Sequence, residues 1–102
     1  MALRGEASFR KAGFRLWPSG GGFESWRRDV PDTESILGGP VYIEITSDED
    51  PGAPWDGTGI VVKAWKERVE WPMLEFNAET VAHALRLTRD IEGSIPRDYM
   101  EV

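Results

Sequence analysis

The chain has 102 residues, no cysteine and a formal net charge of −6 at pH 7. Without cysteine it cannot form disulfides, thiolate zinc sites or iron–sulfur clusters, and it has no cysteine nucleophile. No stretch approaches the roughly 20 apolar residues of a membrane-spanning helix, and the N-terminus lacks the apolar core of a signal peptide. These features predict a single domain, 1–102, in the cytoplasm, where reducing conditions suit a cysteine-free protein.

Charge is distributed unevenly along the chain. Residues 1–28 carry six basic and two acidic side chains, a balance of +4, whereas residues 29–102 carry six basic and sixteen acidic ones, a balance of −10. This pattern predicts a basic, glycine-rich N-terminal part on an acidic body. The acidic excess argues against broad nucleic-acid binding, because most of the surface would repel phosphates.

The first third of the chain gives the weakest structural signals. Ala7–Trp17 mixes apolar and basic residues, which predicts one strand or two short strands bent at Gly13. Pro18 is expected to end this strand, since proline cannot donate to a central ladder, and the glycines of Ser19–Gly22 predict a loop. Pro31–Gly39 has capping residues at both ends and predicts one or two helical turns.

The middle of the chain has the clearest strand patterns. Val41–Thr46 alternates apolar and polar residues, as a half-buried strand does. Thr58–Trp65 is rich in β-branched residues and alternates in the same way. Arg68–Phe76 continues the alternation with a phase slip at Pro72, which predicts a bulge or an edge position. The short link between the last two segments predicts an antiparallel hairpin.

The best helical pattern spans Asn77–Gly93 and predicts a helix over about 78–92. Asn77 is a good N-cap and Gly93 suits the position after the last turn. The apolar stripe of this helix comprises Val81, Ala84, Leu85, Thr88 and Ile91. The chain is therefore predicted to adopt an α+β fold, a small antiparallel sheet of three to five strands with one long C-terminal helix packed on one face.

The acidic segment between the two central strands fails the specific motif tests. As a calcium loop starting at Asp48, it has glycine at position 5 and glycine at position 12, where ligands are required. The residues Asp56 to Thr58 are similar to the second half of the Asp-x-Asp-Gly-Thr motif of haloacid dehalogenase-type phosphatases, but Pro54 replaces the nucleophile. We therefore expect neither a metal site nor a cofactor.

The single histidine also argues against catalysis. His83 falls on the polar side of the predicted helix, so we expect it to be solvated rather than to act as an acid or base. A zinc site with one histidine and no cysteine would have to consist mostly of carboxylates. No pair of carboxylates stands out among the acidic residues, so the chain is expected not to be an enzyme.

The leading hypothesis is a non-catalytic protein-binding module. Small, acidic, aromatic-rich chains without cysteine are typical of inhibitor or immunity-type proteins of phages and bacteria, which dock on a basic surface of a target protein. The acidic segment would accelerate association, and its tryptophan would anchor the interface. The residues predicted to bind the partner are Asp48, Glu49, Asp50, Trp55 and Asp56.

Two alternatives stay open. The first is a nucleic-acid or nucleoprotein accessory, because basic and aromatic residues alternate in the N-terminal part as they do in single-strand binding surfaces. Its predicted binding residues are Arg10, Lys11, Arg15, Trp17, Trp26, Arg27 and Arg28. The second is an oligomeric protein that binds a small ligand in pockets between its subunits.

Overall fold

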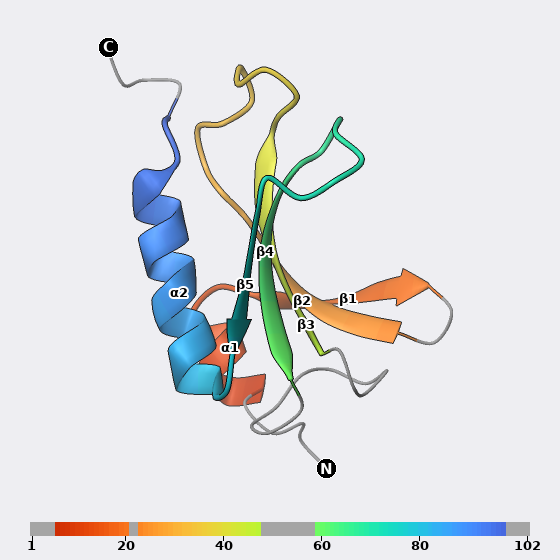
Figure 1. Cartoon of the computed structure of the whole chain (residues 1–102), viewed down its shortest axis with the longest axis vertical. Coiled ribbons are helices and arrows are strands. Elements are labelled where there is room, and N and C mark those ends of the chain that lie inside the picture. Colours follow the sequence, from red (N-terminus) through yellow and green to blue (C-terminus); the bar gives the residue numbers. More distant parts are fainter. Residues whose placement is uncertain (1–5, 21–22, 48–58, 98–102) are drawn as a thin grey trace.

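The computed structural model describes residues 6–20, 23–47 and 59–97. Five strands form one sheet in which neighbours in the chain are neighbours in space, and every adjacent pair is antiparallel (Figure 1). The elements are α1 (Glu6–Lys11), β1 (Arg15–Gly20), β2 (Phe23–Asp29), β3 (Val41–Ser47), β4 (Ile60–Lys66), β5 (Leu74–Ala78) and α2 (Val81–Ser94). The predicted α+β fold with a long C-terminal helix is confirmed.

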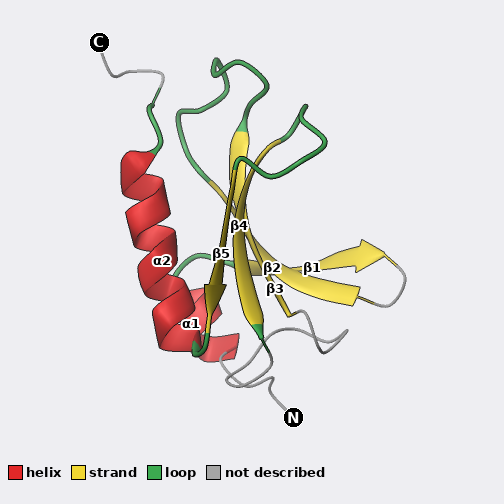
Figure 2. Ribbon diagram, in the orientation of Figure 1, coloured by secondary structure: helices red, strands yellow, loops and turns green. Residues whose placement is uncertain are grey.

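Both helices lie on the same face of the sheet (Figure 2). Helix α2 packs against β4 and β5, whereas α1 lies over β2, where the rings of Phe9 and Trp26 stack with centroids 5.2 Å apart. The strand register continues this covered face, because Trp26 pairs with Ile45 and Ile45 with Val62. The buried apolar core comprises Phe9, Phe14, Trp26, Val30, Val41, Ile43, Ile45, Ile60, Val62, Ala64, Ala78, Val81, Ala84, Ile91 and Ile95.

The predicted strand over residues 7–11 is wrong, because this segment is helix α1. An ion pair one turn apart, Arg10 Nε to Glu6 Oε1 at 2.9 Å, supports the helix. The helix is less than two turns long and buries only Phe9. A single buried residue cannot repeat at helical intervals, so the sequence shows no helical pattern here. Gly13, at φ 91°, then reverses the chain into β1. The strand at 15–17 and the bend at Gly13 are as predicted.

Pro18 lies inside β1 instead of ending it. Strand β1 is at the edge of the sheet, where a missing amide hydrogen removes no bond from a central ladder. The register shifts between Pro18 and Gly20, which marks a local irregularity in the pairing with β2. The position in the sheet therefore explains why proline is tolerated here.

The predicted helical turns at 31–39 are also wrong. The segment consists of bends and turns, with positive φ at Asp32 (59°) and Gly38 (81°). The buried side chain of Thr33 closes this loop, since its hydroxyl donates to the Val30 carbonyl and accepts from the Val41 amide. A polar side chain that bonds neighbouring backbone groups competes with helix formation in this way.

The last strand and the long helix begin later than the sequence predicts. Strand β5 starts at Leu74, because residues 67–73 form a loop that is joined to β4 by the Met73 amide donating to the Ala64 carbonyl. Because Asn77 belongs to β5, the N-cap of α2 is Thr80, whose hydroxyl accepts from the His83 amide. Among the described residues, no helix is long and apolar enough to cross a membrane.

Replacing Phe9 tests whether α1 is part of the core. Phe9→Ala is expected to lower the free energy of unfolding by about 3–5 kcal/mol, because it removes a fully buried ring. Chemical denaturation followed by tryptophan fluorescence measures the change. The control Leu37→Ala removes an exposed side chain and should stay within about 0.5 kcal/mol. A Phe9→Ala value as small as the control would mean that α1 is not packed on the sheet.

Candidate functional site

The residues predicted to bind a partner protein, Asp48, Glu49, Asp50, Trp55 and Asp56, lie outside the described residues, so their role stays a prediction. The predicted nucleic-acid-binding residues are described, and they are divided between the two faces of the sheet. Trp26 is fully buried in the core, and Arg28 reaches towards the helices. Arg15, Trp17 and Arg27 share the second face, by their register. The seven residues therefore do not form one surface.

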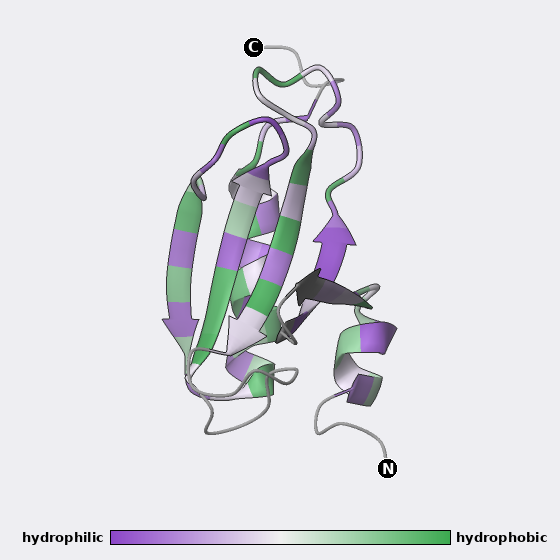
Figure 3. Ribbon diagram, turned by 90° about the vertical axis from the view of Figure 1, so that its right-hand side faces the viewer, coloured by the Kyte–Doolittle hydropathy of each residue, from purple (hydrophilic) through white to green (hydrophobic). Residues whose placement is uncertain are grey.

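The second face, which no described helix covers, carries a row of charged residues across all five strands (Figure 3). The row follows the strand register and consists of Arg15, Arg27, Glu44, Lys63 and Glu75. Three of the four pairs join opposite charges, which stabilises a sheet modestly, whereas Arg15 and Arg27 carry like charges and both lie beside Asp29. Most members of this row occupy polar positions of the strands that the sequence predicts to alternate. Only the strand register shows that they lie opposite one another.

Aromatic rings lie beside this row and contact its cations. The Arg27 guanidinium lies 3.8 Å from the ring centroid of Tyr42 and 4.6 Å from that of Trp17. The rings of Tyr42 and Trp65 are nearly parallel, with centroids 6.4 Å apart, and the Lys63 ammonium lies 5.8 Å from the Trp65 ring. These contacts form a cation–π ladder, which stabilises the exposed face and holds its long side chains in place.

Acidic side chains neutralise much of the positive charge on this face. Arg15 and Arg27 both lie 3.6 Å from Asp29 carboxylate oxygens. Glu44 accepts hydrogen bonds from the Ser25 hydroxyl and the Trp65 indole, both at 3.1 Å. A phosphate backbone would have to displace or face these acids, so the second face is poorly suited to nucleic acid.

A different surface exposes large apolar side chains at one end of the molecule. Leu37 is 91% exposed, Trp71 69% and Met73 37%. They lie on the loop before β3 and on the loop between β4 and β5, which are found at the same end of the sheet (Figure 1). We call these three side chains the tip surface. Large apolar side chains that are exposed at the same end of a molecule often mark an interaction site.

The two loops of the tip surface are bonded to each other. The Arg68 amide donates to the Gly38 carbonyl and the Glu67 amide to the Pro40 carbonyl, both at 2.9 Å. Gly38 has a positive φ, and a Cβ atom there would lie 2.8 Å from a methyl group of Val69. Only glycine fits this close approach, so the backbone beneath the tip surface is fixed by contacts between the loops.

Acidic residues predominate around the tip surface. The segments 31–40 and 66–73, the second of which begins at the last residue of β4, contain four acidic and two basic side chains, a local balance of −2. The acidic residues, all exposed, are Asp32, Glu34, Glu67 and Glu70. The sequence does not predict the tip surface, because Trp71 and Met73 fit a strand pattern and the segment around Leu37 fits a helical one.

The described residues offer no arrangement for metal binding. No group of three or more His, Cys, Asp or Glu side chains among them is placed to hold a metal ion. His83 is half-buried in the first turn of α2, where its backbone amide bonds to the N-cap. His83 therefore contributes to the N-cap through its backbone amide, and this position gives its imidazole ring no chemical role.

The titration of Tyr42 tests the arrangement of the second face. Burial raises the pKa of Tyr42 above its ordinary value of 10.0; Arg27 opposes this shift, whereas Glu44 and Glu67 add to it. Arg27→Gln is therefore expected to raise this pKa further and Glu44→Gln to lower it. The absorbance of tyrosinate during an alkaline titration measures both shifts, and Tyr42→Phe identifies the signal.

The same raised pKa has a consequence for stability. The folded state binds the phenolic proton of Tyr42 more tightly than the unfolded chain does. This difference adds to the free energy of unfolding at every pH below the pKa of the unfolded chain, and the contribution is lost as the pH rises through the pKa of the folded state.

A Tyr42 pKa that falls in Arg27→Gln would contradict the described contact between these two side chains.

Comparison with models of known protein families, with curated proteins and with solved structures finds no match for this chain. No relative therefore suggests an activity. The function has to be inferred from the described surfaces themselves: the cation–π ladder of the second face and the tip surface with its acidic surroundings.

Proposed function

We propose that the protein is a non-catalytic binding module that inserts its tip surface into an apolar recess of a target protein, and that basic residues surround this recess. The observation that carries the proposal is the exposure of Leu37 and Trp71 on two loops that are hydrogen-bonded to each other. A small inhibitor or immunity-type protein fits this description.

The anchor of the proposed interface is Trp71. Tryptophan is enriched among the few residues that dominate binding energy, because it buries a large apolar area at a small cost in side-chain entropy. The bonds between the loops hold the backbone before this residue, and the Met73 amide, bonded to the Ala64 carbonyl of β4, holds it afterwards, so little further ordering is needed on binding. Preorganisation of this kind raises affinity by lowering the entropic cost of association.

The charge around the tip surface supports a basic partner. Its local balance of −2 has the same sign as the net charge of −6 of the whole chain. An acidic surface accelerates association with a basic one, and it disfavours acidic partners and nucleic acid. The acidic segment 48–56 connects β3 and β4 at the end of the sheet opposite the tip surface, where Ser47 pairs with Ile60, so its predicted role stays a separate prediction.

The nucleic-acid alternative would use the cation–π ladder of the second face, where Trp17, Tyr42 and Trp65 present aromatic rings. Stacking of bases on such rings is independent of sequence. The arginines beside these rings already pair with Asp29, which weakens this alternative. Absence of single-stranded oligonucleotide binding at low salt would exclude it.

Replacing Trp71 tests the proposed interface. The full chain is used to capture proteins from its source organism, and a protein that is retained by the wild type but not by a blank matrix is then purified. Its affinity, measured by calorimetry, is expected to fall about 30-fold in Trp71→Ala, since a central anchor contributes ~2 kcal/mol or more. The affinity of the wild type should also fall with increasing salt.

The matched control is Phe76→Ala. Phe76 is another exposed aromatic residue, 42% exposed, but it lies on β5 outside the tip surface. This variant should retain the wild-type affinity. Equal losses in Trp71→Ala and Phe76→Ala would point to nonspecific apolar binding, and an unchanged affinity in Trp71→Ala would exclude the tip surface as the interface.

A further inference from the structure

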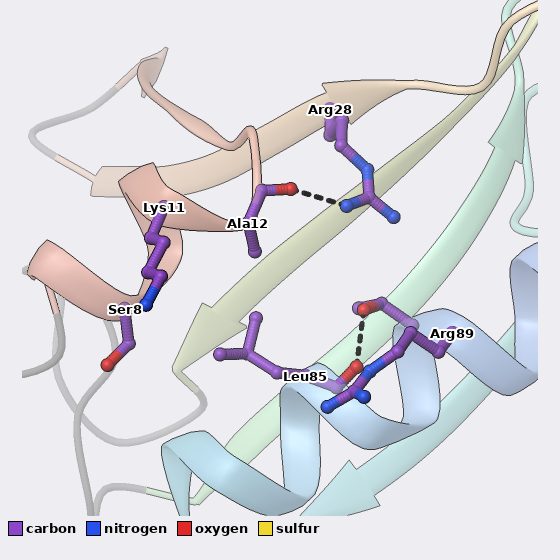
Figure 4. A pocket seen from close by; sticks show the side chains of 7 residues that line it. Ser8, Lys11, Ala12, Arg28, Leu85 and Arg89 are labelled. Carbon is purple, nitrogen blue, oxygen red and sulfur yellow. Dashed lines mark hydrogen bonds between the residues drawn. The ribbon is translucent and has the colours of Figure 1, made fainter.

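A hollow of about 420 Å³ lies between the two helices and β2, away from the tip surface (Figure 4). Three cationic side chains line it, and each comes from a different element: Lys11 from α1, Arg28 from β2 and Arg89 from α2. Ala12 and Leu85 add apolar surface to its wall. The nucleic-acid prediction included Lys11 and Arg28 but not Arg89.

The hollow is positively charged in an otherwise acidic protein. Glu92 is bonded to Arg28 at 2.8 Å, so the four charged groups leave a local balance of +2. Within the described part of the chain, neither Lys11 nor Arg89 forms an ion pair. Two cations without a carboxylate partner therefore lie beside a third that is held in place.

Arg28 is fixed at the back of this hollow by contacts with the link between α1 and β1 and with α2. One terminal nitrogen donates to the Ala12 carbonyl and the other to Glu92, and the guanidinium lies 4.7 Å from the Phe14 ring centroid. A Cβ atom on Gly13 would lie 3.2 Å from the Arg28 side chain, so glycine gives it room. Each terminal nitrogen carries two protons, so each keeps one for a further acceptor.

We propose that this hollow binds a small-molecule phosphate monoester. A phosphate monoester carries a charge of about −1.5 to −2 at pH 7, which matches the local balance of +2. Its three terminal oxygens accept hydrogen bonds from Lys11, Arg28 and Arg89, and charge-assisted bonds of this kind are the strong ones. A carboxylate offers two oxygens and one charge, so it leaves either Lys11 or Arg89 uncompensated.

The organic part of the ligand occupies the rest of the hollow. The space is far larger than a phosphate group, and the methyl groups of Ala12 and Leu85 provide an apolar wall. The Ser8 hydroxyl lies at the same opening and supplies one neutral hydrogen-bonding group. A phosphorylated metabolite with a compact apolar portion suits this composition.

Binding of simple phosphates to the full chain tests this proposal. The probes are inorganic phosphate and phenyl phosphate, titrated at constant ionic strength and followed by ¹⁵N–¹H NMR shifts. We expect saturable shifts at residues around the hollow, with tighter binding of phenyl phosphate. Lys11→Gln and Arg89→Gln should each weaken this binding about tenfold or more, the loss of one charge-assisted hydrogen bond. Both residues are exposed, so these variants should fold normally.

Arg86→Gln is the matched control, since it removes the same charge from an exposed position of α2 that does not line the hollow. It should bind phenyl phosphate as the wild type does. An equal loss of affinity in all three variants would mean that phenyl phosphate is held by diffuse electrostatic attraction and not at this site. Unchanged affinity in Lys11→Gln and Arg89→Gln, or absence of saturation at millimolar phenyl phosphate, would overturn the proposal. So would benzoate or a phosphoserine peptide binding more tightly than phenyl phosphate.

Discussion

The covering of a single sheet face by two helices determines the rest of this structure. Five strands bury their apolar side chains on one side only, and neither helix is large enough to cover that side alone. Helix α2 covers β4 and β5, and the stacking of Phe9 on Trp26 closes the part above β2. The hollow with three cations lies where the two helices fail to meet, and Arg28 of β2 joins the link after α1 to α2 at that place.

The same constraint explains the other two surfaces. With the helices on one side, the second face keeps long polar and aromatic side chains, which are ordered by their contacts with one another in the cation–π ladder. The loops at the end of the sheet lie beyond the reach of both helices, so nothing in the described structure covers Leu37 and Trp71. The three surfaces therefore differ in chemistry because they differ in their distance from the helical layer.

The sequence predicts the parts whose periodicity is long and regular, such as β3 and most of α2. The sequence pattern does not predict the structure of a segment that is ordered by one contact with another part of the fold. Phe9 is a single apolar residue in a short helix, and only its position over Trp26 explains why the segment is ordered. The tip surface was hidden for a related reason, since Trp71 fits a strand pattern until the register shows that β5 begins at Leu74. The acidic segment 48–56 was recognised from composition, which gives no position in space.

The order of the strands has a consequence for how the chain folds. Each strand pairs with its neighbours in the chain, so the sheet can grow by successive hairpins that each close a modest loop at low entropic cost. The bond between Arg28 and Glu92 beside the cationic hollow, in contrast, joins residues 64 apart in the sequence. Contacts this distant in sequence slow folding. The cationic hollow, where this bond lies, is therefore the part of the molecule that we expect to assemble last and to open first.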